Sequence, residues 1–183
     1  MTNRMSGTAA VIAVTILFAL PPPAIRSASR PRQSGIETIE TRFPAPEGYI
    51  RTTKPPESFA SYLRRLPLKP PGADIRLYDG RTRSSRGVAA GVVDLPVGDR
   101  DLQQCADAVM RLRSEYLFAC GRSSEIHFDF TSGHVASFAA WARGERPRVR
   151  GARVRWARSA APDASWASLR RYLDVVFTYA GSQ

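Results

Sequence analysis

The chain has 183 residues, of which 43% are hydrophobic and 23% charged, and its 25 Arg and 2 Lys against 16 acidic residues give a formal net charge of +11. This apolar fraction excludes a disordered chain, and two cysteines and two histidines are too few for a disulfide scaffold or a typical structural zinc site. The length and composition therefore predict one globular, strongly basic domain.

The first 29 residues have the three-part layout of a secretory signal peptide. A short basic start precedes twelve apolar residues, 9–20, and three prolines follow. A membrane-spanning helix needs roughly 20 apolar residues, so a cleaved signal is favoured over an anchor or a buried helix. Small residues at Ser27 and Ser29 predict cleavage before Arg30. We therefore expect a soluble, exported protein, periplasmic or extracellular, with no transmembrane segment after cleavage.

A proline-rich segment, 30–56, begins the predicted mature chain and shows no helical or strand periodicity, so it is expected to form an irregular arm. Proline and an acidic residue at 55–57 then mark the start of a helix. Apolar residues at helical spacing predict that this helix covers 58–66. The α+β domain itself is predicted over 57–183.

Two strands are predicted next, an alternating one over 75–80 and a mostly apolar one over 87–95. The loop between them is basic, and its arginines are Arg81, Arg83 and Arg86. Such a loop is either an ordinary solvated turn or a clamp for an anion.

The stretch 99–117 predicts a long helix with two distinct faces. The apolar face repeats at steps of three and four residues and consists of Leu102, Cys105, Val109, Leu112 and Tyr116. A polar stripe repeats in the same way on another face and consists of Gln104, Asp107, Arg111 and Glu115. The stripe is spaced for ion pairs from Asp107 to Arg111 and from Arg111 to Glu115 on the helix surface.

Cys105 has two interpretations. Its place on the predicted apolar face favours packing in the core, where a free cysteine behaves as a small hydrophobe. Its place near a helix N-terminus instead suits a catalytic nucleophile, with His127 or His134 as the base, in a hydrolase acting on cell-wall or other envelope substrates. A disulfide with Cys120 within one chain is strongly disfavoured, because the helix between them spans roughly 20 Å, and Cys120 is expected to be an exposed thiol that leaves an intermolecular bridge open.

Asp107 and Glu115 also form a candidate acid/base pair for glycan or ester hydrolysis. They lie eight residues apart on the predicted helix, so their Cα atoms are about 12 Å apart, which is too far for a retaining glycosidase without bent side chains. A salt-bridged polar face is therefore favoured.

The last third of the chain predicts alternating elements: a strand over 124–130, a helix over 135–143, a strand or ribbon over 148–156 and a final helix over 165–181. The apolar positions of the ribbon are Val149, Val154 and Trp156. The inward face of the final helix is predicted to consist of Trp166, Leu169, Leu173, Val176 and Tyr179. Helices and strands thus mix without regular βαβ alternation. The predicted fold is a single α+β domain, with a mixed or antiparallel sheet packed against about four helices.

An Arg-rich surface is predicted around the ribbon, with Trp141 and Trp156 nearby for stacking. Its candidate anion-binding residues are Arg146, Arg148, Arg150, Arg153 and Arg155. An anionic cell-wall polymer or polysaccharide is the expected partner. No phosphate-binding glycine-rich loop, EF-hand loop or HExxH motif is present, so no nucleotide, metal or cofactor is expected.

Five strings carry a family resemblance: SFASYLRRLPLKPPGADIRLYDG, VGDRDLQQCADAVMRLRSEYLF, IHFDFTSG, WARGERP and RRYLDVVFTYAG. Together they resemble the bacterial family called domain of unknown function 4846, from about Arg42 to Gly181. The resemblance implies an exported protein and implies no particular activity.

Overall fold

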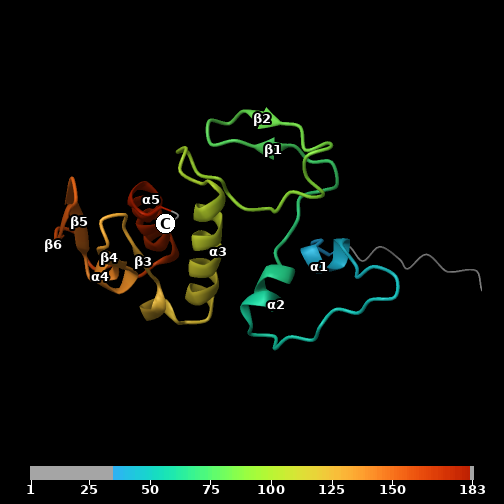
Figure 1. Cartoon of the computed structure of the whole chain (residues 1–183), viewed down its shortest axis with the longest axis horizontal. Coiled ribbons are helices and arrows are strands. Elements are labelled where there is room, and N and C mark those ends of the chain that lie inside the picture. Colours follow the sequence, from blue (N-terminus) through green and yellow to red (C-terminus); the bar gives the residue numbers. More distant parts are fainter. Residues whose placement is uncertain (1–34, 182–183) are drawn as a thin grey trace, which may run out of the picture. The chain divides into compact units, whose positions relative to one another are not determined.

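The computed structural model describes residues 35–181 (Figure 1), so the predicted signal peptide, 1–29, lies outside the described residues. Within 35–181 the chain forms five α-helices, one 3-10 turn and three two-stranded antiparallel sheets. The predicted single-domain α+β class is confirmed, although its strands form three separate pairs. Among these helices, none is long and apolar enough to span a bilayer.

Two short helices come first. The predicted irregular arm contains α1, Ile39–Arg42, whose start is capped by the side chain of Thr38. The predicted helix over 58–66 is confirmed as α2, Phe59–Arg64. The hydroxyl of Ser58 accepts a hydrogen bond from the Ser61 N–H at 3.2 Å, which satisfies one of the free donors at the helix start.

The first strand pair is shorter than predicted. Strand β1, Ile75–Arg76, pairs with β2, Thr82–Arg83, inside the predicted basic loop. The predicted strand over 87–95 is wrong. The chain turns back at Asp79 and Gly80, so β1 pairs with the residues directly after the turn, β2, and not with 87–95. Gly80 adopts φ +83°, a conformation that glycine accepts without strain.

The long helix α3, Cys105–Ala119, starts six residues later than predicted, and it turns a different face inward. Its buried residues are Asp107, Arg111, Ser114, Glu115, Tyr116 and Leu117. The predicted apolar face is confirmed at Tyr116, which is buried, and at Leu102, which packs against the core, but Val109 is 64% exposed. Most of the predicted polar stripe therefore faces inward, so the prediction of a surface ion-pair face is wrong.

The C-terminal part begins with η1, Ser123–Glu125, and the antiparallel pair β3, His127–Asp129, and β4, Val135–Ser137. The helix predicted over 135–143 is therefore too long, because its first three residues pair with β3 and only α4, Phe138–Ala142, is helical. The final helix is confirmed as α5, Trp166–Tyr179, with the hydroxyl of Ser165 as its N-cap.

The core gathers around α5, which packs against α3 and α4. The predicted face of α5 is confirmed at Leu169, Leu173 and Val176, each with no exposed surface. It is wrong at the two ends of the helix, where Trp166 is 45% and Tyr179 37% exposed. Two buried hydrogen bonds tie the helices and strands together. The Tyr172 hydroxyl donates to the Ala136 carbonyl oxygen at 2.8 Å, and the Trp141 indole donates to the Ser168 hydroxyl at 3.1 Å.

Candidate anion-binding site

The last strand pair forms a hairpin of β5, Glu145–Arg150, and β6, Arg153–Arg158 (Figure 1). A two-residue turn, 151–152, joins the strands. Gly151 has φ +56° at the first central position, where a tight hairpin turn requires a residue that tolerates positive φ. The ribbon predicted over 148–156 is thus a hairpin that extends by three residues at its start and two at its end.

The hairpin has an inner and an outer face, because successive side chains on a strand point to opposite sides. On the inner face Val149 lies opposite Val154, and Pro147 lies opposite Trp156. Val149, Val154 and Trp156 pack against the hydrophobic core. This contact fixes the hairpin by its apolar side and leaves the other side to the arginines.

Four arginines, which we call the Arg quartet, lie on the outer face. Arg148 lies opposite Arg155, and Arg150 lies opposite Arg153. All four side chains are exposed, and together they line a hollow of about 310 Å³. Within residues 35–181, no acidic side chain pairs with any of them and no carbonyl accepts from their guanidinium groups. Four positive charges therefore meet without a counter-charge of the protein's own.

Arg146 is the fifth arginine of the outer face, and it is engaged differently. Its guanidinium stacks over the Trp141 ring, 3.8 Å from the centroid, and donates to the carbonyl oxygens of Trp141 and Glu145. Burial lowers its pKa, although a guanidinium stays charged in any ordinary buffer. Arg146 thus anchors the hairpin to α4.

The remaining residues predicted for the Arg-rich surface are placed as follows. Trp141 is buried, and Trp156 lies on the inner face with its indole N–H buried and unbonded within the described residues. Arg81 is paired with Asp79 at 2.5 Å, while Arg83 and Arg86 are exposed. Arg83 lies in β2. The Arg quartet, by contrast, brings four such arginines together around one hollow.

The polar stripe of α3 forms a buried ion cluster. The Arg111 guanidinium donates to the Glu115 carboxylate at 2.7 Å, and Arg170 from α5 contacts the same oxygen at 3.3 Å. Arg111 also donates to the Pro96 carbonyl and to the Gln103 side chain, both at 2.7 Å. The predicted Arg111–Glu115 ion pair is confirmed, whereas the predicted Asp107–Arg111 pair does not form. The bonds from Arg111 to Pro96 and Gln103 hold the loop before α3 against the helix.

The proposed acid/base pair of Asp107 and Glu115 is committed to internal contacts. The Asp107 carboxylate accepts a hydrogen bond from the Gln104 backbone N–H at 2.9 Å, at the start of α3. Glu115 is 2% exposed and is neutralised by two guanidinium groups. This arrangement supports stability, since buried charges require partners.

Tyr62 faces this cluster, and we expect its ionisation to weaken the fold at high pH. Burial and the negative charge of Glu115 raise the pKa of Tyr62 from 10.0 to about 12, and burial raises the pKa of Tyr172 as well. Because both pKa values are higher in the folded chain, the stability they contribute is complete below pH 10 and is lost as pH rises through the folded pKa. Urea unfolding at pH 9 and pH 11 measures the loss, and Tyr62→Phe should make the free energy of unfolding fall less between the two pH values. If the free energy of unfolding fell by the same amount in Tyr62→Phe, the ionisation of Tyr62 would not be the cause of the loss.

Cys105 and Cys120 are both free and exposed, so the prediction that Cys105 packs in the core is wrong. Cys105 is exposed because α3 buries the side that carries Asp107, Arg111 and Glu115, and not the side that carries Cys105 and Val109. Cys105 lines a cavity of about 260 Å³ with Gln104, Asp107 and Phe177 among its walls.

His127 is exposed and lines a different cavity of about 500 Å³, together with Leu117. Leu117 lies twelve residues beyond Cys105 on α3, roughly 18 Å along the axis. His134 is half-buried in the turn between β3 and β4, and its carbonyl accepts from the Phe130 N–H. A cysteine nucleophile needs its base within hydrogen-bond reach, and the structure places Cys105 and His127 in separate cavities.

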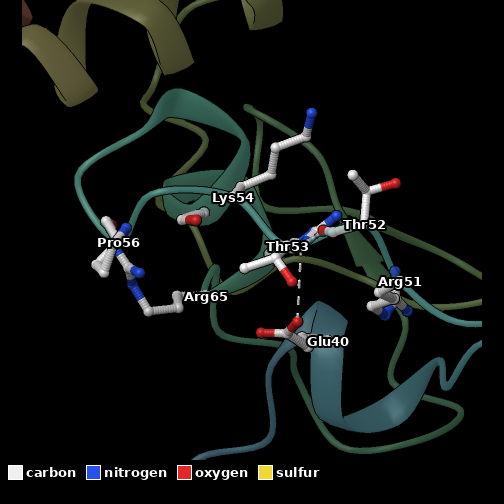
Figure 2. Close-up of a pocket in the computed structure, with 9 residues that line it drawn as sticks. Glu40, Arg51, Thr52, Thr53, Lys54, Pro56 and Arg65 are labelled. Atoms are coloured by element: carbon white, nitrogen blue, oxygen red, sulfur yellow. Dashed lines mark hydrogen bonds and ion pairs between the residues drawn. The ribbon is translucent and has the colours of Figure 1, made fainter.

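Sequence reasoning missed one further basic cavity, of about 380 Å³, between the N-terminal arm and α2 (Figure 2). Arg64 donates to the Thr52 carbonyl at 3.1 Å and faces Glu40 at 4.0 Å, and Arg65 donates to the Pro56 carbonyl at 2.9 Å. These bonds fasten the arm to α2. The only signal in the sequence is the pair of adjacent arginines, which does not indicate the carbonyl groups they bind.

Comparison with known proteins supplies one match. No curated protein and no solved structure is similar enough to match the chain. The family model described as domain of unknown function (4846) matches residues 39–183, which is well over half of the chain. The chain therefore belongs to the family of domain of unknown function 4846.

Proposed function

We propose that this chain is an exported protein of the cell envelope that binds an anionic polymer through the Arg quartet. The observation that supports the proposal is the set of cross-strand pairs, Arg148 with Arg155 and Arg150 with Arg153, around one hollow without an acidic partner in the described residues. Cleavage before Arg30 removes Arg4 and Arg26 and no acidic residue, so the exported chain keeps a formal net charge of +9, which adds a long-range attraction for any polyanion.

The quartet is costly for the free hairpin. Like charges directly opposite each other on two strands destabilise the pair. Elsewhere the described arginines more often have partners, as Arg122 does with Glu125 and Arg171 with Asp163. A polyanion laid over the outer face would supply the missing counter-charge, and guanidinium groups bind phosphate, sulfate and carboxylate groups through paired N–H donors.

Replacing all four quartet arginines with glutamine should weaken polymer binding at least about a hundredfold, because each charge-assisted hydrogen bond contributes about 1.5–3 kcal/mol. Binding of the wild-type chain to heparin or teichoic acid, measured by titration calorimetry, should also weaken steeply from 50 to 200 mM salt, by analogy with other polyanion complexes.

The matched control removes four charges elsewhere, at arginines whose side chains already form exposed ion pairs: Arg81, Arg122, Arg143 and Arg171. Glutamine at these positions removes the same net charge but leaves the quartet intact, so most of the affinity should remain. Equal losses in both variants, or binding that does not respond to salt, would reject the quartet as the binding site.

Export is tested separately, by the intact mass of the protein secreted from a bacterial host. The proposal expects a mass that lacks residues 1–29, because the apolar run 9–20 is too short to anchor the chain. A product that keeps Met1 and stays with the membrane fraction would replace the soluble assignment with a tethered one.

A further inference from the structure

The spacing of the Arg quartet points to a particular form of ligand. The quartet consists of two cross-strand pairs on the outer face, which we call rungs. The turn rung, Arg150 and Arg153, lies next to the turn, and the base rung, Arg148 and Arg155, lies one step further from it. Residues two apart on a strand are separated by about 7 Å, whereas directly opposite residues have Cα atoms about 5 Å apart. Each rung is thus a pair of arginines at directly opposite positions, and the two rungs succeed each other along the hairpin.

We infer that the two rungs hold successive phosphate groups of one linear chain, which lies parallel to the strands. This inference rests on the proposed function and adds the chemical class and the orientation of the ligand. A bridge of about three carbon atoms between phosphates matches one rung spacing. The single hollow lined by all four arginines leaves both groups in one continuous site.

Phosphate is favoured over carboxylate by the directions of its acceptor atoms. A carboxylate can accept from two guanidinium groups, as Glu115 does, but its lone pairs lie in one plane. The free oxygens of a phosphate within a linear chain are arranged tetrahedrally, so two forks can bind them from opposite sides. Since no internal acceptor occupies these four guanidinium groups within residues 35–181, all of their donors are free for the ligand.

The inner face keeps both rungs in place. Val149 and Val154 pack against the core directly between the two rungs, on the other side of the hairpin. Arg146 stacks over Trp141 and secures the base of β5. The spacing of the rungs is therefore set by the backbone before a ligand arrives, which reduces the ordering cost of binding.

The test compares two ligands and two variants by calorimetry at constant ionic strength. Propane-1,3-diyl bisphosphate carries two phosphates on a three-carbon bridge, and propyl phosphate carries one. The wild-type chain should prefer the bisphosphate by about a hundredfold or more, because its second phosphate binds intramolecularly. The rung variant, Arg150→Gln with Arg153→Gln, keeps one site, and its preference should fall below about tenfold.

The strand variant, Arg148→Gln with Arg150→Gln, removes the same charge but leaves one arginine in each rung. It should bind both ligands more weakly and still prefer the bisphosphate. Equal loss of preference in the rung and strand variants would overturn the two-rung inference. The second rung variant, Arg148→Gln with Arg155→Gln, repeats the test, and circular dichroism confirms that each variant is folded.

Glutarate, which has two carboxylates on the same bridge, should bind at least about tenfold more weakly than the bisphosphate, since each terminal phosphate carries about −1.5 to −2 charges and each carboxylate −1. Equal affinity would overturn the assignment to phosphate. The proposed function fails on a different result. A chain that prefers the bisphosphate but does not bind the envelope polymer at low salt would contradict the proposed function and not the two-rung inference.

Discussion

Glu115→Leu is expected to destabilise the protein by about 3–5 kcal/mol, the typical cost of leaving a buried charge without its partner. Arg111 is 4% exposed and would keep only neutral acceptors, the Pro96 carbonyl and the Gln103 side chain. Whole domains are stable by only about 5–15 kcal/mol, so this single change removes a large share of the total. The free energy of unfolding in urea measures it.

The double variant Arg111→Met with Glu115→Leu identifies the cause. It removes both buried charges of the pair, and Arg170, with 21% of its side chain exposed, can turn towards water. The loss should therefore be smaller than the sum of the two single losses, as in other buried pairs replaced by apolar residues. Additive losses would mean that Glu115 stabilises α3 through packing alone.

Trp141→Ala is the second large effect we expect, again about 3–5 kcal/mol of stability lost. The side chain is 5% exposed, and its ring meets Tyr172 at a centroid distance of 5.9 Å. Its indole N–H donates a hydrogen bond to the Ser168 hydroxyl, and the guanidinium of Arg146 stacks over its ring. Truncation removes all three contacts and opens a cavity between α4, α5 and the hairpin.

Trp166→Ala is the matched control, because it makes the same chemical change at a residue that is 45% exposed. Its ring contacts Phe118 from the start of α5, so a smaller loss is expected than at Trp141. Thermal unfolding followed by circular dichroism compares the two. A loss at Trp166 that equals the loss at Trp141 would contradict the central place of Trp141 in the core.

Local patterns predicted the elements whose partners are apolar. The periodicity of α5 identified Leu169, Leu173 and Val176, which pack in the core, and the alternation in 148–156 placed Val149 and Val154 on one side of a ribbon. In both cases apolar side chains face inward, which is the assumption behind periodicity arguments. The Arg quartet follows from the same alternation.

The orientation of α3 could not be obtained in this way. Its inner face is polar because Arg111 binds groups far away in the sequence, among them Pro96 and, through Glu115, Arg170. No local spacing reports such partners, so the apolar residues Cys105 and Val109 were assigned to the core. The separate role of Arg146 could not be predicted either. Its spacing is the same as that of the quartet, and only its contact with Trp141 distinguishes it.

The division of the strands into three separate ribbons has a consequence for proteolysis. A two-stranded hairpin is only marginally stable on its own, and β5 and β6 depend on the contacts of their inner face. Such an element opens locally more often than the helices behind it. Because the outer face carries four exposed arginines, trypsin should cut the free protein at this hairpin. A bound polyanion would cover the same bonds, so occupancy of the site and resistance to digestion would rise together.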